Sequence, residues 1–207
     1  PDNTGTYQPG QILLPEGKKP LILSLVPAHY TTGLAGDGFA RRLVVASGGQ
    51  IACEYVDAEG KATPGNYDLV SILETFLTQH PDFSYRGARA ILGISGDPSP
   101  LGYDLTDETE QASARKVALC LLNTGYEFAS FTYDGIGEAS EEEVAQDVKQ
   151  WKETLEPVLG PVSILFYANG SDLASYEGAK FQTLYEGGFR YFCALDSSVP
   201  SWVQIEN

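Results

Sequence analysis

The segment GYEFASFTYDGIGEAS, residues 125–140, has the pattern of a strand that ends in a turn and leads into a helix. Apolar and small residues alternate over residues 127–132, and Gly135 and Gly137 then interrupt the alternation. Ser140 and Glu143 have the spacing of a helix capping box. In α/β proteins, functional side chains are placed where a strand ends before a helix. Here that turn reads Phe-Thr-Tyr-Asp-Gly and contains neither histidine nor cysteine.

The same alternation of strand and helix patterns runs through the rest of the chain. Further strands are predicted at residues 21–26, 90–95, 162–168, 189–195 and 202–205, and helices at residues 67–80, 107–123, from 140 onward, and 179–185. Two short β-rich runs around Ser47–Gly49 predict a hairpin over residues 43–57, outside the main sheet. Repeated strand–helix units imply a parallel sheet with right-handed crossovers, which an open sheet or a barrel would satisfy.

Composition restricts the class of partner. Hydrophobic residues make up 43% of the 207 residues, which is enough for a sizeable core. The formal net charge is −15, so the chain offers no basic stripe that could release counterions from phosphates, and nucleic acid is not expected as a partner. No apolar run reaches the roughly 18 residues of a membrane span. The three cysteines form no CxxC pair.

The N-terminal region has a composition of its own. Residues 1–19 are polar and rich in glycine and proline, and we interpret them as a linker before a domain over residues 20–207. The chain begins with Pro1 rather than methionine. We therefore expect that a leader has been removed, and that the protein is extracellular or lies at the cell surface.

Several segments of the sequence resemble a known family. They are LILSLVPAHY (21–30), HPDFSYRGARAILGISGDPSPLGYDL (80–105), TGYEFASFTYDG (124–135) and EGAKFQTLYEGGFRYFCALDSSVPSWVQ (177–204). In this order, over nearly the whole chain, they resemble a branch of the polysaccharide deacetylase (NodB-homology, carbohydrate esterase family 4) superfamily found in gut Firmicutes. The resemblance implies a distorted (β/α) barrel with the hairpin as an insertion, and further barrel strands after Asn207.

The resemblance also implies a chemistry. In the family, a divalent metal such as zinc is held by Asp, His and His at the C-terminal ends of the strands, and a neighbouring Asp acts as general base. The metal polarises an acetyl carbonyl and acidifies bound water, and the carboxylate accepts the proton. The product is a glycan that has lost an N-acetyl or O-acetyl group.

The family's functional residues do not carry over to this chain. Val26 and Pro27 stand where the first motif has two aspartates, and Phe131 and Gly135 stand where the second has its two histidines. None of these side chains has a ligand atom, so no catalytic residue, metal or other cofactor is predicted. The third motif, normally aromatic-Pro-aromatic-Gly, appears as LFYANGSD (165–172) without its proline.

Other side chains at predicted strand ends could line a ligand site. Aromatic rings beside amides and carboxylates suit a sugar, which stacks through its CH faces and hydrogen-bonds through its hydroxyls. The alternative is that the aromatic residues fill the core. A new metal site made of His29, Asp37 and Asp134 is a weaker hypothesis. The candidate ligand-binding residues are His29, Tyr133, Asp134, Tyr167, Asn169, Asp172, Asp196 and Trp202.

Three functions follow from these observations. The leading hypothesis is a deacetylase-like domain that has lost metal-dependent deacetylation and binds a glycan or cell-wall carbohydrate. A second is an active hydrolase that cleaves N-acetyl or ester bonds of a polysaccharide with a non-standard set of residues. A third is a structural surface scaffold. The sequence does not indicate an oligomeric state.

Overall fold

The computed structural model describes residues 12–26, 28, 30, 36–96, 99–133, 136, 139–167 and 178–194. The chain divides into two units, of which the larger spans Leu23–Leu195. The smaller unit combines Pro1–Ile22 with Asp196–Asn207. Its described part, residues 12–22, contains no helix or strand. All the elements described below belong to the larger unit.

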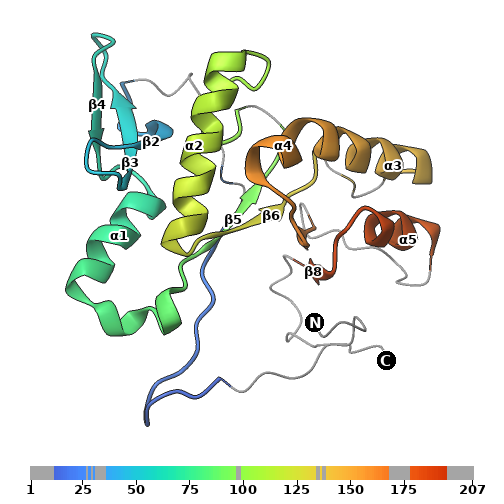
Figure 1. The fold of residues 1–207 in the computed structure, drawn as a ribbon, viewed down its shortest axis with the longest axis horizontal. Coiled ribbons are helices and arrows are strands. Elements are labelled where there is room, and N and C mark those ends of the chain that lie inside the picture. Colours follow the sequence, from blue (N-terminus) through green and yellow to red (C-terminus); the bar gives the residue numbers. More distant parts are fainter. Residues whose placement is uncertain are drawn as a thin grey trace. The chain divides into compact units, whose positions relative to one another are not determined.

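The larger unit is built on a five-stranded parallel sheet in the order β1-β5-β6-β7-β8. Figure 1 labels β5, β6 and β8 of this sheet. Each new strand pairs with the strand that precedes it in this series, as in one half of a (β/α) barrel. The prediction that five segments form neighbouring parallel strands is therefore confirmed. The strands themselves are shorter than predicted: β1 (Ser24–Leu25), β5 (Ile91–Ile94), β6 (Glu127–Ser130), β7 (Ile164–Phe166) and β8 (Tyr191–Cys193).

Helices connect the strands, and a side-chain cap begins α1, α2 and α3. Asp68 caps α1 (Leu69–Gln79), and Asp107 caps α2 (Glu108–Thr124). Ser140 and Glu143 form the capping box of α3 (Glu141–Gln150), as their spacing predicts. This helix continues through a π-helical segment, η4 (Trp151–Leu155), into α4 (Glu156–Leu159). The remaining helices are α5 (Ala179–Glu186) and the short 3-10 turns η2 (Pro81–Phe83) and η3 (Tyr85–Gly87).

A second, antiparallel sheet lies between β1 and α1 in the chain. Strands β2 (Ala40–Val45) and β3 (Ile51–Val56) form the predicted hairpin. A third strand, β4 (Ala62–Gly65), pairs with β3 and was not predicted. Pro64 lies within β4, and proline is tolerated there because β4 is an edge strand with a partner on one side only. This sheet contacts α1 and α2, beside which it lies in Figure 1.

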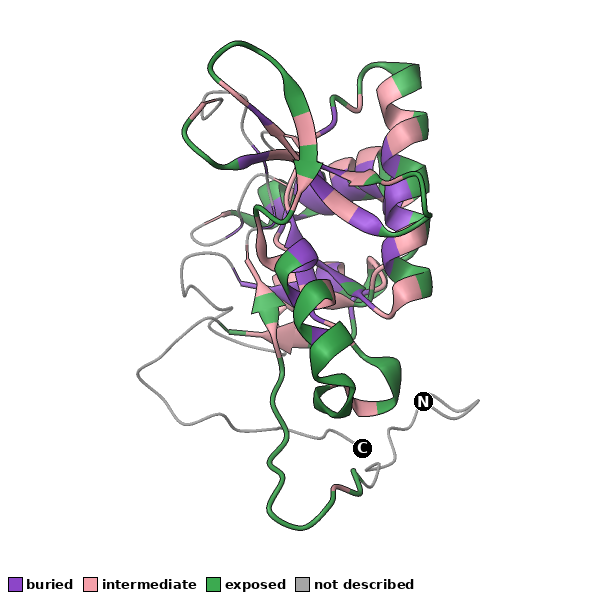
Figure 2. Cartoon of the chain, turned by 90° about the vertical axis from the view of Figure 1, so that its left-hand side faces the viewer, coloured by how far each residue is buried: buried purple, intermediate pink, exposed green. Residues whose placement is uncertain are grey.

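The core lies between the parallel sheet and its helices, where the buried residues gather in Figure 2. Leu92, Ile94, Phe128 and Leu165 share one face of the sheet by the two-residue alternation of strands, and all four are buried. They belong to one apolar cluster with the buried stripe of α2. Burial of each such aliphatic or aromatic side chain contributes about 1.5–3 kcal/mol. The α2 residues of this cluster are Ala114, Val117, Ala118 and Leu121.

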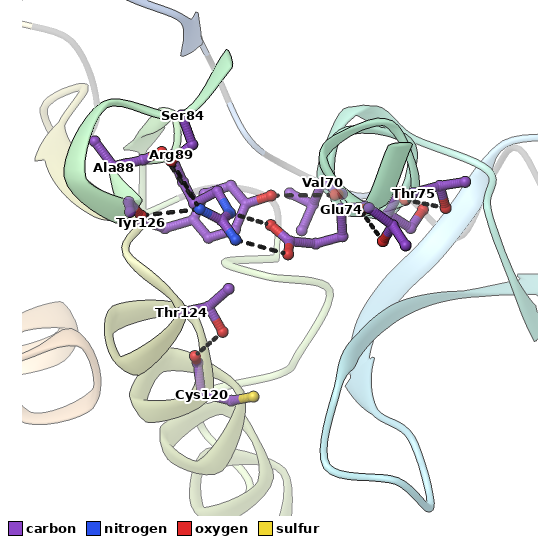
Figure 3. A network of polar contacts seen from close by, with 12 residues as sticks. Val70, Glu74, Thr75, Ser84, Ala88, Arg89, Cys120, Thr124 and Tyr126 are labelled. Carbon is purple, nitrogen blue, oxygen red and sulfur yellow. Dashed lines mark hydrogen bonds and ion pairs between the residues drawn. The ribbon is translucent and has the colours of Figure 1, made fainter. Parts of the chain in front are cut away.

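A polar network connects α1 to the N-terminal ends of β5 and β6 (Figure 3). The Arg89 guanidinium donates to both carboxylate oxygens of Glu74, at 2.7 and 3.4 Å, and to Ser84 Oγ at 3.2 Å. The Tyr126 hydroxyl donates to the backbone oxygen of Val70 at 3.1 Å. In barrel folds, the N-terminal edge of the sheet serves stability rather than chemistry. We therefore interpret this network as structural.

Candidate functional site

The C-terminal ends of the five parallel strands lie at one edge of the sheet, where α/β folds place their ligand sites. Backbone hydrogen bonds continue the strand pairing past the strand ends. Ala28 N donates to Gly93 O at 2.7 Å, Phe131 N to Ile94 O at 2.7 Å, and Tyr167 N to Cys193 O at 3.0 Å. The segments that follow the strands are thus held in register as they reach this edge.

Apolar side chains lie at the two described positions where the resemblance places ligand residues. Val26 directly follows β1, and Phe131 directly follows β6. A Cβ atom placed on Gly93 would lie 3.1 Å from Val26 Cγ1 and 3.3 Å from Phe166 Cδ2, so both side chains cover Gly93 on one face of the sheet. Phe131 is half-buried. Neither Val26 nor Phe131 can supply a ligand atom, and Pro27 and Gly135 lie outside the described residues.

The turn after β6 has an unusual backbone. Thr132 has a φ of 63°, although it is β-branched and only 1% exposed. A left-handed conformation costs a non-glycine residue about 1–2 kcal/mol. Two hydrogen bonds hold the turn: Thr132 N donates to Ser130 Oγ at 3.0 Å, and Thr132 Oγ1 donates to Phe131 O at 2.6 Å. Strain of this kind persists where the surroundings determine the conformation, and it concentrates at functional sites.

Both the backbone N–H and the backbone carbonyl oxygen of Tyr133 are hydrogen-bonded. Its N–H donates to Asp147 Oδ1 of α3 at 3.0 Å, and its carbonyl oxygen accepts from Gly96 N at 3.0 Å. A Cβ atom placed on Gly96 would lie only 2.5 Å from the Tyr133 ring, so the ring packs directly on the glycine backbone. The side chain is half-buried. Tyr133 is therefore held in place at this edge, where it also packs against the apolar core.

A second chain of polar contacts connects Tyr30, which follows β1, to α1 and β3. The Tyr30 hydroxyl donates to Asp68 Oδ2 at 2.6 Å, and Asp68 also caps α1. Ser71 Oγ lies 3.4 Å from Asp68 Oδ1 and 2.8 Å from the buried Cys53 Sγ. Burial, and after it the Asp68 charge, raise the pKa of Tyr30 well above its usual range. Burial also raises the pKa of the Cys53 thiol, which disfavours its thiolate form.

Tyr167 lies in the core rather than at an accessible surface. Its side chain is 1% exposed, and its ring stacks against Phe192 with 6.2 Å between centroids. Of the eight candidate ligand-binding residues, only Tyr133 and Tyr167 are described, and Tyr133 alone is partly exposed. The other six candidates lie outside the described residues: His29, Asp134, Asn169, Asp172, Asp196 and Trp202.

The proposed cation site of His29, Asp37 and Asp134 has only Asp37 among the described residues, in an exposed turn. Within the described ranges, no three His, Cys, Asp or Glu side chains are grouped so that they could hold a metal ion. In the same part of the chain, no helix has both the length and the apolar composition that a membrane span requires.

Several members of this site were not predicted from the sequence, among them Asp147 and Ser130. Asp147 is 7% exposed and lies on the buried stripe of α3 between Val144 and Val148. A carboxylate on an apolar stripe was the signal that could have found it, because a buried charge needs partners. Ser130, which accepts the Thr132 N–H, gave no such signal, since a serine within a strand is common.

Comparison with known proteins does not extend this picture. No protein-family model matches the chain, and no curated protein and no solved structure is significantly similar to it. The C-terminal edge of the parallel sheet carries the apolar side chains of Val26 and Phe131 and the fixed aromatic ring of Tyr133. Such an edge can bind a ligand with an apolar face, and its described side chains include no nucleophile–base pair.

Proposed function

We propose that this protein is a deacetylase-like domain of the NodB type that binds a glycan or cell-wall carbohydrate, outside the cell or at its surface, without metal-dependent deacetylation. The parallel sheet, whose strands follow one another as in half of a (β/α) barrel, is consistent with the distorted barrel of that family. The deacetylase resemblance of the sequence supplies the carbohydrate class.

The single observation that carries the proposal is the apolar and aromatic character of the described residues at the strand ends. Val26 and Phe131 occupy positions at which metal chemistry would need Asp and His, while Tyr133 offers a ring in a fixed orientation. Sugars stack their CH faces on such rings, and an aromatic contact contributes about 0.5–1.5 kcal/mol beyond the area that it buries. The edge is thus better suited to holding a sugar than to hydrolysing its acetyl group.

A binding experiment tests the proposal. The protein is titrated with chitotetraose and with xylotetraose by isothermal calorimetry, and we expect saturable binding of at least one of them. Tyr133→Ala should weaken this binding by about three- to tenfold, in line with the loss of one aromatic contact. Tyr185→Ala is the matched control, because Tyr185 is an exposed tyrosine of α5 at 44% exposure. Binding of neither oligosaccharide would contradict the proposal and leave the scaffold hypothesis.

An assay for acetate distinguishes the remaining alternative. Acetylated chitooligosaccharides and acetylated xylan are incubated with the protein, with zinc, cobalt or manganese added or with a chelator. We expect no acetate release above that of the metal alone. Metal-dependent release that is lost in His29→Ala or Asp134→Ala would contradict the proposal and establish an active hydrolase with a non-standard site.

A further inference from the structure

We infer that Gly96, Thr132 and Asp147 are positioning residues that hold Tyr133 as a preorganised platform for a sugar ring. The inference rests on the proposed glycan-binding function and names the residues that determine how the site binds. Each of the three comes from a different element: Gly96 follows β5, Thr132 follows β6, and Asp147 lies on α3.

The backbone of Tyr133 is fixed before any ligand arrives. Its N–H and its carbonyl oxygen are both hydrogen-bonded, to Asp147 Oδ1 and to Gly96 N, each at 3.0 Å. Asp147 is 7% exposed, so this hydrogen bond to a carboxylate is shielded from water and is stronger than one at the surface. Thr132 is held at a φ of 63° by Ser130, and this left-handed residue sets the direction in which the chain leaves β6.

Gly96 has no side chain, so the ring of Tyr133 can pack directly against its backbone. Three ring atoms, Cγ, Cδ2 and Cε2, lie within 2.7 Å of the position that a Gly96 Cβ would take. Any larger residue at position 96 would displace the whole ring. The clash includes Cγ, the ring atom nearest the backbone, and Cγ moves only if the whole side chain rotates. One part of the ring is therefore supported by backbone, and the side chain remains half-buried rather than enclosed.

A fixed ring favours binding because the side-chain entropy of Tyr133 is lost during folding rather than when the ligand binds. A flexible tyrosine loses side-chain freedom when a ligand stacks on it, and a preorganised one does not. The strained conformation of Thr132 lowers the free energy of unfolding, and in return it helps to position Tyr133. A turn with only a structural role would be less strained with glycine or asparagine at this position.

The test separates the position of the ring from the binding of the sugar. In the full chain, NMR should show a nuclear Overhauser effect between the Gly96 Hα protons and the Tyr133 ring. Gly96→Ala should abolish the wild-type ring position and weaken binding of the better of chitotetraose and xylotetraose by about tenfold. Gly48→Ala is the matched control, because a Cβ there meets only the flexible tip of the Gln50 side chain.

Substitutions of Asp147 provide the second arm. Asp147→Asn keeps the Oδ1 acceptor and should keep the ring contact and wild-type affinity, whereas Asp147→Ala should lose the ring contact and bind about three- to tenfold more weakly. If Asp147→Ala does not fold, Gly96→Ala and Asp147→Asn still decide the inference. Wild-type affinity in Gly96→Ala with a displaced ring overturns the inference and leaves the proposed function intact. Failure of the wild-type protein to bind either oligosaccharide overturns the proposed function and the ligand role of Tyr133 with it.

Discussion

Two glycines at helix ends share a left-handed backbone but differ in what surrounds them. Gly125 follows α2 with a φ of 111°, and Gly188 follows α5 with a φ of 106°. A Cβ atom on Gly125 would overlap the carbonyl oxygen of Gly87, whereas a Cβ atom on Gly188 would meet no atom within 4 Å. The pair therefore separates the cost of backbone strain from the cost of a steric clash.

We expect Gly188→Ala to lower the free energy of unfolding by about 1–2 kcal/mol, which is the cost of a left-handed alanine. Gly125→Ala should lose about 1–3 kcal/mol more, because the backbone of η3 must also move. Urea unfolding of both variants beside the wild-type protein measures the two values. Equal losses would show that the segment around Gly87 moves away freely, and that the close contact at Gly125 carries no energy.

The capping residue of α2 gives a prediction at the scale of one element. Asp107 Oδ1 accepts from the backbone N–H groups of Thr109 and Glu110, at 2.9 Å each. Asp107→Ala leaves both donors without this acceptor, and we expect a loss of about 1 kcal/mol in the free energy of unfolding. Asp107→Asn keeps an acceptor and should lie within a few tenths of a kcal/mol of wild type. Denaturant unfolding that fails to distinguish the alanine variant from the asparagine variant would refute this role.

The elements that the sequence predicts correctly are those with local signals. Asp107 and Ser140 lie at helix starts, and Gly125 lies at a helix end, because capping depends on residues only a few positions apart. The strand β4 was missed because Pro64 is a local signal against a strand, and only its place at an edge of the sheet removes the conflict. Strand lengths were overestimated because apolar runs continue past the last paired residue.

The candidate site was less predictable because its contacts join distant parts of the chain. The strand-end position of Tyr133 follows from the alternation of residues 127–132, and this half of the site was predicted. Its support by Gly96 and Asp147 was not, since it depends on packing between β5, β6 and α3. The left-handed Thr132 also had no local signal, because this conformation is typical of glycine and asparagine rather than of threonine.

At the scale of the whole molecule, buried tyrosines predict a loss of stability at alkaline pH. The pKa values of Tyr30, Tyr103 and Tyr126 are all raised, and burial is the largest cause in each. For Tyr30 and Tyr126, nearby acidic groups, Asp68 and Glu74, act in the same direction as burial. The three hydroxyls donate hydrogen bonds to Asp68, to Leu43 O and to Val70 O, so they are needed in the protonated form.

The sign follows from proton linkage. Below a pH of about 10, a tyrosine is protonated in both the folded and the unfolded chain, and the stability contribution is complete. Above it, the unfolded chain releases the proton while the folded chain retains it, so the free energy of unfolding falls by about 1.4 kcal/mol per pH unit for each such tyrosine. Stability is therefore lost as the pH rises from about 10 toward the raised folded pKa values.

Urea unfolding between pH 8 and pH 11 measures this loss, and the comparison with Tyr126→Phe isolates one tyrosine. The general repulsion within a chain of net charge −15 also grows at high pH, but it is nearly the same in both proteins. The variant lacks the hydrogen bond to Val70 O and should be less stable than wild type by about 1 kcal/mol at pH 8. The variant has no proton to lose at position 126. Above pH 10, its free energy of unfolding should therefore fall less steeply than that of the wild type, and the two slopes should differ by about 1.4 kcal/mol per pH unit. Parallel curves for the two proteins up to pH 11 would contradict the burial-raised pKa of Tyr126 and the structural role of its protonated hydroxyl.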